Sequence, residues 1–365
     1  MLRVAMFAPH YAEYVTRLAL ELSKTNDVLL ILDKKNRTNE LGASIYESAK
    51  ATLRYFEFRS DTRIGRRISR ATVAARILLF RPDVVHVQEQ PDQLTSIIVS
   101  ILRRFYPIFL TVHDPKPHVG NDAEYAVRWR KYRENIRNSA YLHHVHGRHC
   151  SQLMEAEGVP APLIVETFHG PILIPLLDQT KSSRIGRILF FGRMEKYKGL
   201  DLLLEAAKYL SGLGRAYEFV LAGRGEELDR LHSTIETLAN VTVINRFLTP
   251  DEAIDQFQQA AVVVLPYREA TQSGVVAAAF ANGRPVVATA VGGLVDVIEN
   301  NVNGLLITPD SHIDLAEALD QILSDESLRV RLATGALDTG LHTLSWTGIC
   351  RILAEAYDRR PPKSQ

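Results

Sequence analysis

Apolar runs alternate with segments of helical periodicity along the whole chain. An apolar run over residues 2–8 precedes a segment with apolar side chains every three or four positions, and a second run covers 27–32. Later runs in the first half cover 83–87, 107–113, 140–146 and 163–169, with a predicted helix over 93–104. Alternating strands and helices of this kind predict a parallel sheet that is covered by helices on both faces.

The alternation stops near Gly170 and resumes at Arg187. Residues 171–185 carry two prolines and a polar run, which predicts a linker. A second series of strands and helices follows, starting with the apolar run RILFF and continuing to LVDVIE at residues 294–299. The pattern therefore predicts two doubly wound α/β domains. Ligands of such sheets bind at the carboxyl ends of the strands, so we expect the site in the cleft between the domains.

Composition is that of an ordinary globular protein. The chain has 365 residues, of which 46% are hydrophobic and 23% charged. The two cysteines, Cys150 and Cys350, are far apart and form no disulfide or zinc spacing, which favours a reducing compartment. The N-terminus does not resemble a signal peptide, and the longest apolar stretch, 274–297, is interrupted by polar residues and a proline. We therefore expect a cytoplasmic protein.

The first half of the chain is basic. Residues 1–175 hold 24 lysines and arginines against 18 acidic residues, although the whole chain has a net charge of only +1. The segment from Arg54 to Arg81 holds eight arginines against Glu57 and Asp61. Five of these arginines follow near-helical spacing: Arg59, Arg63, Arg66, Arg67 and Arg70. The segment is either a solvated helix or a contact with anionic lipid on the inner face of a membrane.

Two cations follow the first strand of the second domain. Arg193 and Lys198 come after Gly192 and before a predicted helix that begins near Leu200. A strand-to-helix turn offers free backbone N–H groups and the positive end of a helix dipole, and two cations placed there can neutralise a diphosphate without a metal. The alternative is a solvated basic turn, as the neighbouring Lys196 illustrates.

A polar loop follows a later strand of the same domain. It consists of Thr271, Gln272, Ser273 and Gly274 and opens a helix of small residues. Ser273 can cap this helix, and Gly274 allows a ligand to approach the backbone, so the loop is a second candidate anion site. The alternative is a capped helix that is buried for packing alone.

Histidines mark strand ends in the first domain. His113 ends the apolar run 107–113 and can hydrogen-bond a sugar hydroxyl or a developing charge, although a structural role is the alternative. Four more histidines lie at 143, 144, 146 and 149, and period two places His144 and His146 on one face. No carboxylate or cysteine completes a ligand set there, so we expect no metal. The sequence GRGEEL has Leu228 where a dinucleotide fingerprint needs its third glycine, so we expect no cofactor.

The ordered set of these segments resembles the family 4 glycosyltransferases of the GT-B fold. The resemblance rests on RPDVVHV, LTVHD, FHGP, FFGRMEKYKGLDLLLEA, LAGRGEE, VVVLPY, ANGRPVVAT, VGGLVDVI and NGLLI, and SWTGICRILAEAY is similar to the closing helix of that family. It implies two Rossmann-like domains that face a cleft, with a C-terminal helix that crosses back onto the first domain. The implied domains are an acceptor-binding domain over 1–170, the linker over 171–185, a nucleotide-sugar-binding domain over 186–344, and the crossing helix and tail over 345–365.

The resemblance also implies an activity. Such enzymes, of the hexosyltransferase type and without a metal, transfer a sugar with retention from a UDP- or GDP-linked donor to a glycan or lipid-linked acceptor, in polysaccharide or glycolipid biosynthesis. Arg193 and Lys198 are then expected to hold the diphosphate, His113 to contact the donor sugar, and His10 and Tyr11 to face the acceptor. The implied donor-binding residues are Gly192, Gly223, Arg246, Phe247, Glu269, Thr271, Gln272, Ser273 and Gly274.

Two departures separate this chain from the usual pattern. The family usually carries two glutamates eight positions apart, and the corresponding positions here are Ala270 and Ala278. Glu269 is one residue from the first position, whereas the second, which usually binds ribose, has no carboxylate. The ATQSG loop resembles a subgroup with this substitution. The first loop has Pro9, His10 and Tyr11 in place of paired glycines, so the resemblance does not extend to the identity of the acceptor.

Two other interpretations compete with a transferase. A sugar-nucleotide epimerase of the same fold needs catalytic carboxylates in the cleft, and Asp114 is the best candidate. A degenerate subunit that binds nucleotide without turnover is compatible with the missing carboxylate at Ala278.

Overall fold

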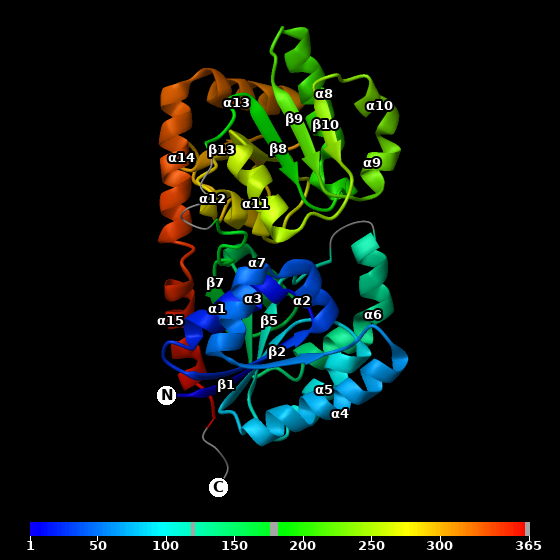
Figure 1. Cartoon of the computed structure of the whole chain (residues 1–365), viewed down its shortest axis with the longest axis vertical. Coiled ribbons are helices and arrows are strands. Elements are labelled where there is room, and N and C mark those ends of the chain that lie inside the picture. The colour runs from blue at the N-terminus through cyan, green and yellow to red at the C-terminus, as the bar shows by residue number, and fades with distance from the viewer. Residues whose placement is uncertain (118–120, 176–181, 362–365) are drawn as a thin grey trace. The chain divides into compact units, whose positions relative to one another are not determined.

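A computed structural model describes residues 1–117, 121–175 and 182–361 (Figure 1). The chain divides into two compact units. Unit 1 consists of Met1–Pro115, Glu124–Gly170 and Trp346–Gln365, and unit 2 consists of Lys116–Ala123 and Pro171–Ser345. Of the predicted linker, residues 176–181 lie outside the described part of the chain.

Unit 1 is built on a seven-stranded parallel sheet with the strand order β3-β2-β1-β4-β5-β6-β7. Its strands are β1 (Arg3–Ala8), β2 (Asp27–Asp33), β3 (Arg54–Phe58), β4 (Val84–Gln88), β5 (Ile108–Val112), β6 (Leu142–His146) and β7 (Ile164–Thr167). Its helices are α1 (Ala12–Leu22), α2 (Lys34–Glu40), α3 (Ala43–Thr52), α4 (Arg63–Phe80), α5 (Gln93–Leu102), most of α6 (Asn121–Arg137), α7 (Arg148–Ala156), η1 (Ala161–Leu163) and α15 (Trp346–Asp358).

The central strands of unit 1 are buried on both faces. Every residue of β4, β5 and β6 is buried, because helices cover both sides of the sheet. Parallel strands that are buried on both faces appear in a sequence as continuous apolar runs, which is the pattern of this chain. The core also includes apolar side chains of α4 and α5, such as Val73, Ile77 and Ile98.

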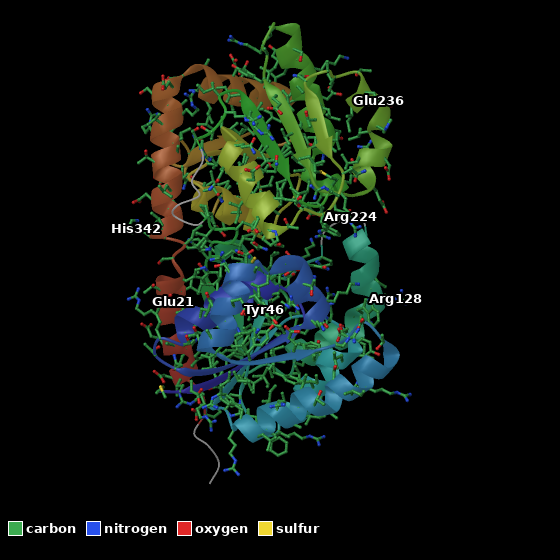
Figure 2. The ribbon with its side chains drawn as sticks, in the orientation of Figure 1. Glu21, Tyr46, Arg128, Arg224, Glu236 and His342 are labelled. Atoms are coloured by element: carbon green, nitrogen blue, oxygen red, sulfur yellow. The ribbon has the colours of Figure 1, made fainter. Side chains whose placement is uncertain are left out.

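The last helix of the chain, α15, packs onto unit 1. The hydroxyl of Tyr357 lies 2.6 Å from Nδ1 of the buried His86 on β4. Thr347 donates a 2.7 Å hydrogen bond to Glu21, which Figure 2 labels beside this helix. The expectation of a C-terminal helix that returns to the N-terminal domain is thereby confirmed.

Unit 2 is built on a six-stranded parallel sheet with the order β10-β9-β8-β11-β12-β13. Its strands are β8 (Arg187–Phe191), β9 (Glu218–Ala222), β10 (Val241–Ile244), β11 (Val262–Leu265), β12 (Val286–Thr289) and β13 (Gly304–Ile307). Its helices are η3 (Lys196–Lys198), α8 (Leu200–Gly212), α9 (Glu226–Arg230), α10 (His232–Glu236), α11 (Pro250–Gln259), α12 (Gly274–Ala281), η4 (Gly292–Leu294), α13 (His312–Ser324) and α14 (Glu326–Leu341).

The strand order of unit 2 reverses at β8. On one side of β8 lie β9 and β10, and on the other side lie β11, β12 and β13. β8 itself pairs with both β9 and β11. The loops that follow β8 and β11 therefore start side by side at the carboxyl edge of the sheet. Such a switch point is where open α/β sheets bind their ligands.

The basic segment from Arg54 to Arg81 does not form one helix. Its first residues form β3 at the edge of the sheet, and α4 begins only at Arg63, so Arg59 precedes the helix. The aromatic residues Tyr55, Phe56 and Phe58 favour a strand, and this segment pairs with β2. The side chains of Arg63 and Arg66 lie outside the described part of the structure. Among the described residues, no helix combines the length and apolar character needed to span a membrane.

Candidate functional site

The loop after β8 is held against the loop after β11. Gly199 ends η3 in the left-handed region, with φ 67°, and precedes α8, which begins at Leu200 as the sequence predicts. A Cβ atom on Gly199 would lie 2.0 Å from the carbonyl oxygen of Pro266. Only glycine accepts both this conformation and this contact. The close approach places the residues before Gly199 next to those after Pro266.

Lys198 is buried at this junction, with 7% of its surface exposed. Its Nζ donates a 3.1 Å hydrogen bond to the hydroxyl of Tyr267 and lies 4.9 Å from the centre of that ring. A Cβ atom on Gly192 would lie 2.9 Å from the same Nζ, so the ammonium group rests on the backbone of Gly192. Lys198 is therefore not part of a solvated turn, whereas Lys196 is exposed.

Tyr267 joins the two predicted anion sites. Its hydroxyl shares a hydrogen bond with the side chain of Ser273, and the charge of Arg193 acts on it. Burial raises the pKa of Tyr267, and the contributions of Ser273 and Arg193 only partly oppose this effect. The phenol is therefore neutral. Lys198 and Ser273, which are distant in sequence, thus meet at one side chain, and Arg193, from the same turn as Lys198, is near enough for its charge to act on that side chain.

Sequence reasoning missed Tyr267 as a site residue. The tyrosine was visible as the last letter of VVVLPY, two residues after the end of β11. A large polar aromatic residue at a strand end, just before a candidate anion loop, was the available signal. What the sequence could not show is that the hydroxyl turns toward Lys198.

The helix after this loop starts differently from the prediction. Ser273 is the N-cap residue of α12, but its side chain makes no capping hydrogen bond in the described structure. The predicted capping role is wrong because the Ser273 hydroxyl bonds to Tyr267 instead. The N–H of Val276 donates to the carbonyl of Ser273 at 3.2 Å, and the N–H groups that precede it at a helix start without a side-chain cap can bind a ligand.

The segment Ala270–Gln272 is supported from behind by the η4 turn. Gly293 donates its N–H to the carbonyl of Ala270 at 3.0 Å, and a Cβ atom on Gly293 would lie 2.1 Å from the carbonyl oxygen of Thr271. Thr271 is buried and Gln272 half-buried. The backbone of the polar loop is therefore set by close contact with a second loop.

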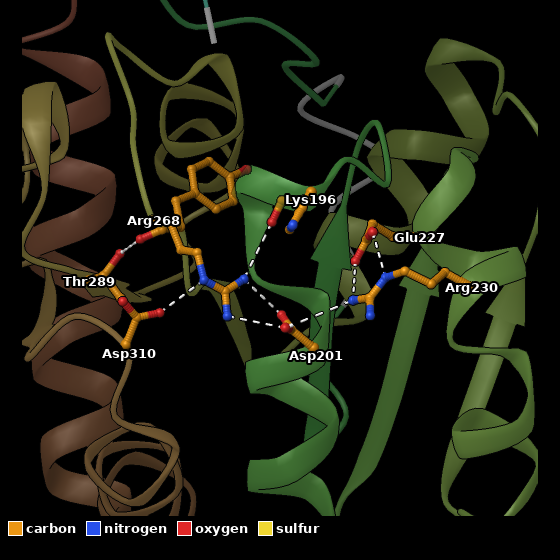
Figure 3. A network of polar contacts seen from close by, with 8 residues as sticks. Lys196, Asp201, Glu227, Arg230, Arg268, Thr289 and Asp310 are labelled. Carbon is orange, nitrogen blue, oxygen red and sulfur yellow. Dashed lines mark hydrogen bonds and ion pairs between the residues drawn. The ribbon is translucent and has the colours of Figure 1, made fainter. Parts of the chain in front are cut away.

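An ionic network lies beneath the two loops (Figure 3). The guanidinium of Arg268 binds Asp201 of α8 at 2.8 Å and Asp310 at 2.9 Å. The backbone N–H of Arg268 donates to the carbonyl of Tyr197 at 2.7 Å. Thr289 of β12 donates to the carbonyl of Tyr267. These contacts fix the backbone on both sides of the Tyr267 side chain. The ion pairs are partly exposed, so their effect is mainly on geometry and only modestly on stability.

The predicted nucleobase residues occupy the next loops. Gly223 follows β9, and a Cβ atom there would lie 1.9 Å from the carbonyl oxygen of Gly192. Phe247 is 64% exposed, and the guanidinium of Arg224 lies 3.8 Å from the centre of its ring. Arg224 is at the carboxyl edge of the unit 2 sheet, after β9 (Figure 2).

Arg246 is engaged at the start of α11. It binds Glu252 with two contacts of 2.8 Å, and Glu252 forms a capping box with Thr249. The guanidinium of Arg246 therefore helps to hold the start of α11. Arg224, which sequence reasoning did not select, is the arginine that lies on Phe247. Glu269 is half-buried, and Ala278 lies in the core.

In unit 1 the structure brings together three predicted residues. Tyr11 precedes α1 with φ 63°, and its ring stacks on His113 with 3.7 Å between ring centres. His113 Nε2 lies 2.9 Å from the side-chain oxygen of Gln88. His10 Nδ1 accepts the N–H of Tyr11 at 2.8 Å and lies 3.3 Å from Glu40. Burial lowers the pKa of His113, which is therefore a neutral imidazole that can hydrogen-bond an uncharged hydroxyl.

His113 belongs to a buried layer of imidazole rings. The other members are His86, His144, His146 and His169. His144 and His146 lie on one face with 5.0 Å between ring centres, as the period-two spacing predicts. Hydrogen bonds run from Tyr357 through His86 and Thr111 to His144. Among the described residues, no group of three or more potential ligands is arranged to hold a metal ion.

A buried arginine anchors the loop after His113. Arg137 of α6 binds Glu89 at 2.6 Å and also binds Glu157. It donates to the carbonyl oxygens of Asp114 and Pro115 at 3.3 and 3.1 Å. The position of Asp114 is therefore set by a charged group in the core, and the half-buried Asp114 lies directly beside His113.

Comparison with known proteins connects unit 2 with a protein family. Residues 186–325 match the family model described as "Glycosyl transferases group 1". D-inositol 3-phosphate glycosyltransferase of Corynebacterium aurimucosum is 32% identical over 178 residues, which cover 47% of this chain and 42% of that protein. Alpha-D-kanosaminyltransferase of Streptomyces kanamyceticus is 30% identical, with 44% and 43% covered. The chain thus spans less than half the length of these relatives.

Solved structures match over the whole chain. Sucrose-phosphate synthase from Thermosynechococcus elongatus has a TM-score of 0.76 at 18% identity, covering 98% of this chain and 99% of that one. Anabaena HepE in complex with UDP-glucose has a TM-score of 0.74 at 16% identity, covering 98% and 100%. At these identities the likeness establishes the fold. The predicted GT-B fold is confirmed.

Proposed function

We propose that this protein is a retaining glycosyltransferase that transfers a sugar from a nucleoside diphosphate sugar to a glycan or lipid-linked glycan. The carrying observation is the contact of Lys198 with Tyr267 at the switch point of unit 2, where Ser273 also bonds to Tyr267 and the charge of Arg193 acts on it. The match of residues 186–325 to a glycosyltransferase family supports it. So does the GT-B fold, which is shared with a solved structure that contains UDP-glucose.

The site suits a diphosphate because it combines two cations with backbone donors. Lys198 is already desolvated and held by Tyr267, so it loses little side-chain freedom when it meets a phosphate. Arg193 is exposed and can bind phosphate oxygens bidentately. The first N–H groups of α12 add a partial positive charge. Charge developing on the departing phosphate is thereby stabilised, which is the largest single contribution in many enzymes.

In this proposal the protein positions the partners and the leaving phosphate assists in deprotonating the acceptor. The neutral His113 hydrogen-bonds a hydroxyl of the donor sugar, and Tyr11, stacked on it, contributes with His10 to the acceptor region. Glu269, Thr271, Gln272 and Gly274 surround phosphate and sugar. Because Ala278 offers no carboxylate to the ribose, the nucleoside is held chiefly at Gly223 and at the Arg224–Phe247 pair, with Arg246 nearby.

Turnover of sugar nucleotides tests the proposal. UDP-glucose and GDP-mannose are incubated with the protein, and nucleotide release is measured for the wild type, Arg193→Ala and Lys198→Ala. Loss of one such charged contact lowers kcat by roughly 10²–10³-fold. Lys196→Ala is the matched control, because Lys196 lies in the same turn but is exposed. Unchanged turnover in both site variants would contradict the assignment.

The same assay separates the competing functions. Isomerisation of the donor sugar without nucleotide release would indicate an epimerase, for which Asp114→Asn is then the informative variant. Nucleotide binding with no turnover of any donor would indicate a degenerate subunit. A thermal-shift screen of UDP, GDP and their sugars identifies the base, because a ligand that binds only the folded state raises stability by RT ln(1 + [L]/Kd).

We further propose that the segment from Arg54 to Arg81 contacts an anionic membrane surface, where a lipid-linked acceptor is found. On α4, Arg67 and Ile68 are exposed next to each other, and Leu79 is 79% exposed. Each basic residue near such a surface contributes about 1 kcal/mol, so binding is expected to be reversible and to weaken with salt. Charge reversal at Arg63, Arg66 and Arg67 should abolish binding to phosphatidylglycerol vesicles, whereas Arg331→Glu on α14 should not. Unchanged vesicle binding would contradict the idea.

A further inference from the structure

A cavity opens at the amino-terminal edge of the unit 1 sheet, where β4, β5 and β6 begin. Its volume is about 520 Å³, in the range of small-molecule sites. The side chains that matter for its chemistry are Asp83, Arg103, Phe105, Tyr106, Tyr141 and Arg360. His113 and Tyr11 lie at the opposite, carboxyl edge of the same sheet, so this cavity is separate from the candidate site.

Two guanidinium groups reach the cavity from different segments of the chain. Arg103 follows α5, and its Nη1 donates to Ser139 Oγ at 3.3 Å. Arg360 follows α15, and its Nη1 donates to the carbonyl of Tyr357 at 3.1 Å and to Asp358 at 3.2 Å. A guanidinium carries five N–H donors. Among the described residues, the hydrogen bonds of both guanidinium groups use Nη1, so each group can offer further donors to a ligand.

The charged side chains that line the cavity are mainly cationic, and Asp358, which pairs with Arg360, is not among the lining residues. Arg103 and Arg360 face one acidic residue among those that line it, Asp83. A carboxylate oxygen of Asp83 accepts the backbone N–H of Arg3 at 2.8 Å, which ties Asp83 to the start of β1. An anionic ligand is therefore favoured over a cation.

Aromatic side chains form the rest of the wall. Phe105 is 62% exposed, and Tyr106 and Tyr141 are half-buried. The hydroxyl of Tyr141 donates to the carbonyl of Arg359 at 2.7 Å, which holds the segment after α15 against the cavity. An exposed phenylalanine next to cations suits a ligand with an organic part as well as a charge.

We propose that this cavity is a binding site for a phosphate ester. The phosphate oxygens accept hydrogen bonds from Arg103 and Arg360, and the organic part lies against Phe105, Tyr106 and Tyr141. Phosphate suits this arrangement because it offers several oxygens to guanidinium groups that arrive from two directions. A soluble phosphate ester and the headgroup of a phospholipid share this chemistry.

Calorimetric titration of the full chain with glycerol 3-phosphate tests the proposal. We expect a Kd of about 1 mM, and at least about a tenfold weakening in Arg103→Glu and in Arg360→Glu. Arg104→Glu is the matched control, because Arg104 is the exposed neighbour of Arg103 and does not line the cavity. Arg103→Glu and Arg360→Glu should leave the binding of UDP unchanged, so failure of this site and failure of the diphosphate site are distinguishable.

Vesicle sedimentation then identifies the source of the phosphate. If Arg103→Glu also loses binding to phosphatidylglycerol vesicles, the ligand is a lipid headgroup, and if it keeps that binding, the ligand is a soluble ester. The proposal is overturned if the wild type binds no glycerol 3-phosphate at about 10 mM, or if all three charge-reversal variants bind it equally. Should charge reversal lower the Tm more than Arg104→Glu does, Arg103→Gln and Arg360→Gln replace those variants.

Discussion

The Nζ atom of Lys198 lies 3.1 Å from the hydroxyl of Tyr267, and this contact joins two loops that are about seventy residues apart in sequence. The lysine comes from the turn after β8 and the tyrosine from the segment after β11. A buried ammonium needs hydrogen-bond acceptors, and the neutral phenol supplies one without neutralising the positive charge. The charge is thereby kept in place where we propose that the diphosphate binds.

Tyr267→Phe removes this acceptor and retains the ring. We expect kcat/KM for the sugar nucleotide to fall by about tenfold, because Lys198 and Ser273 both lose a partner. The free energy of unfolding should fall by about 1–2 kcal/mol. Steady-state kinetics measures kcat/KM, and urea denaturation measures the free energy of unfolding. Tyr209→Phe, at the surface of α8, is the control. Kinetics equal to those of the control would show that Tyr267 does not position the lysine.

Arg224→Ala is expected to weaken UDP binding. The guanidinium lies on the exposed ring of Phe247, and a cation over an aromatic face contributes about 0.5–2 kcal/mol to holding that platform. Arg246→Ala should weaken binding less and should instead lower the Tm, because Arg246 pairs with Glu252 at the start of α11. Titration calorimetry with UDP compares the two variants. A larger loss of affinity in Arg246→Ala would reassign the base-binding arginine.

Gly199→Ala should destabilise the protein more than an ordinary substitution in the left-handed region. Its Cβ would lie 2.0 Å from the carbonyl oxygen of Pro266, and its φ is 67°. Gly214→Ala is a matched control, with φ 75° and no atom within 4 Å of the new Cβ. The control measures backbone strain alone, about 1 kcal/mol. We expect Gly199→Ala to exceed it by more than 1 kcal/mol in urea denaturation, roughly the scale of an overpacked core. Equal losses would show that the two loops can move apart.

Acid should destabilise unit 1 before it affects unit 2. Burial lowers the pKa of His86 to about 3 and that of His169 to about 4, from an ordinary value of 6.5. Below pH 6.5 the unfolded chain binds protons that the folded chain does not, so stability is complete above that pH and is lost as the pH falls. At pH 5 each of these histidines destabilises the fold by about 2 kcal/mol.

Urea denaturation at pH 7 and pH 5 measures this effect. His86→Gln should reduce the loss of stability between the two pH values, whereas His342→Gln, at an exposed position on the helix end, should not. A loss of stability that is the same in His86→Gln and the wild type would contradict the role of the buried layer.

The ATQSG loop shows where prediction from the sequence stopped. Its four polar residues after a strand correctly indicated a helix start at Gly274, because that transition is a local property of the chain. The predicted capping role of Ser273 is wrong. Local rules favour capping, but the phenol of Tyr267 is the partner that tertiary packing provides.

The sequence by itself determined the two parallel sheets, because buried parallel strands leave continuous apolar runs that alternate with helices. It also placed Arg193 and Lys198 in a strand-to-helix turn, since that turn is read from adjacent residues. Only the tertiary structure decided that Lys198 is buried on Tyr267, that Arg224 lies on Phe247, and that Tyr357 reaches His86. Each of these contacts joins residues from separate elements. The partner of each side chain therefore depends on which elements the strand order of the sheet brings together.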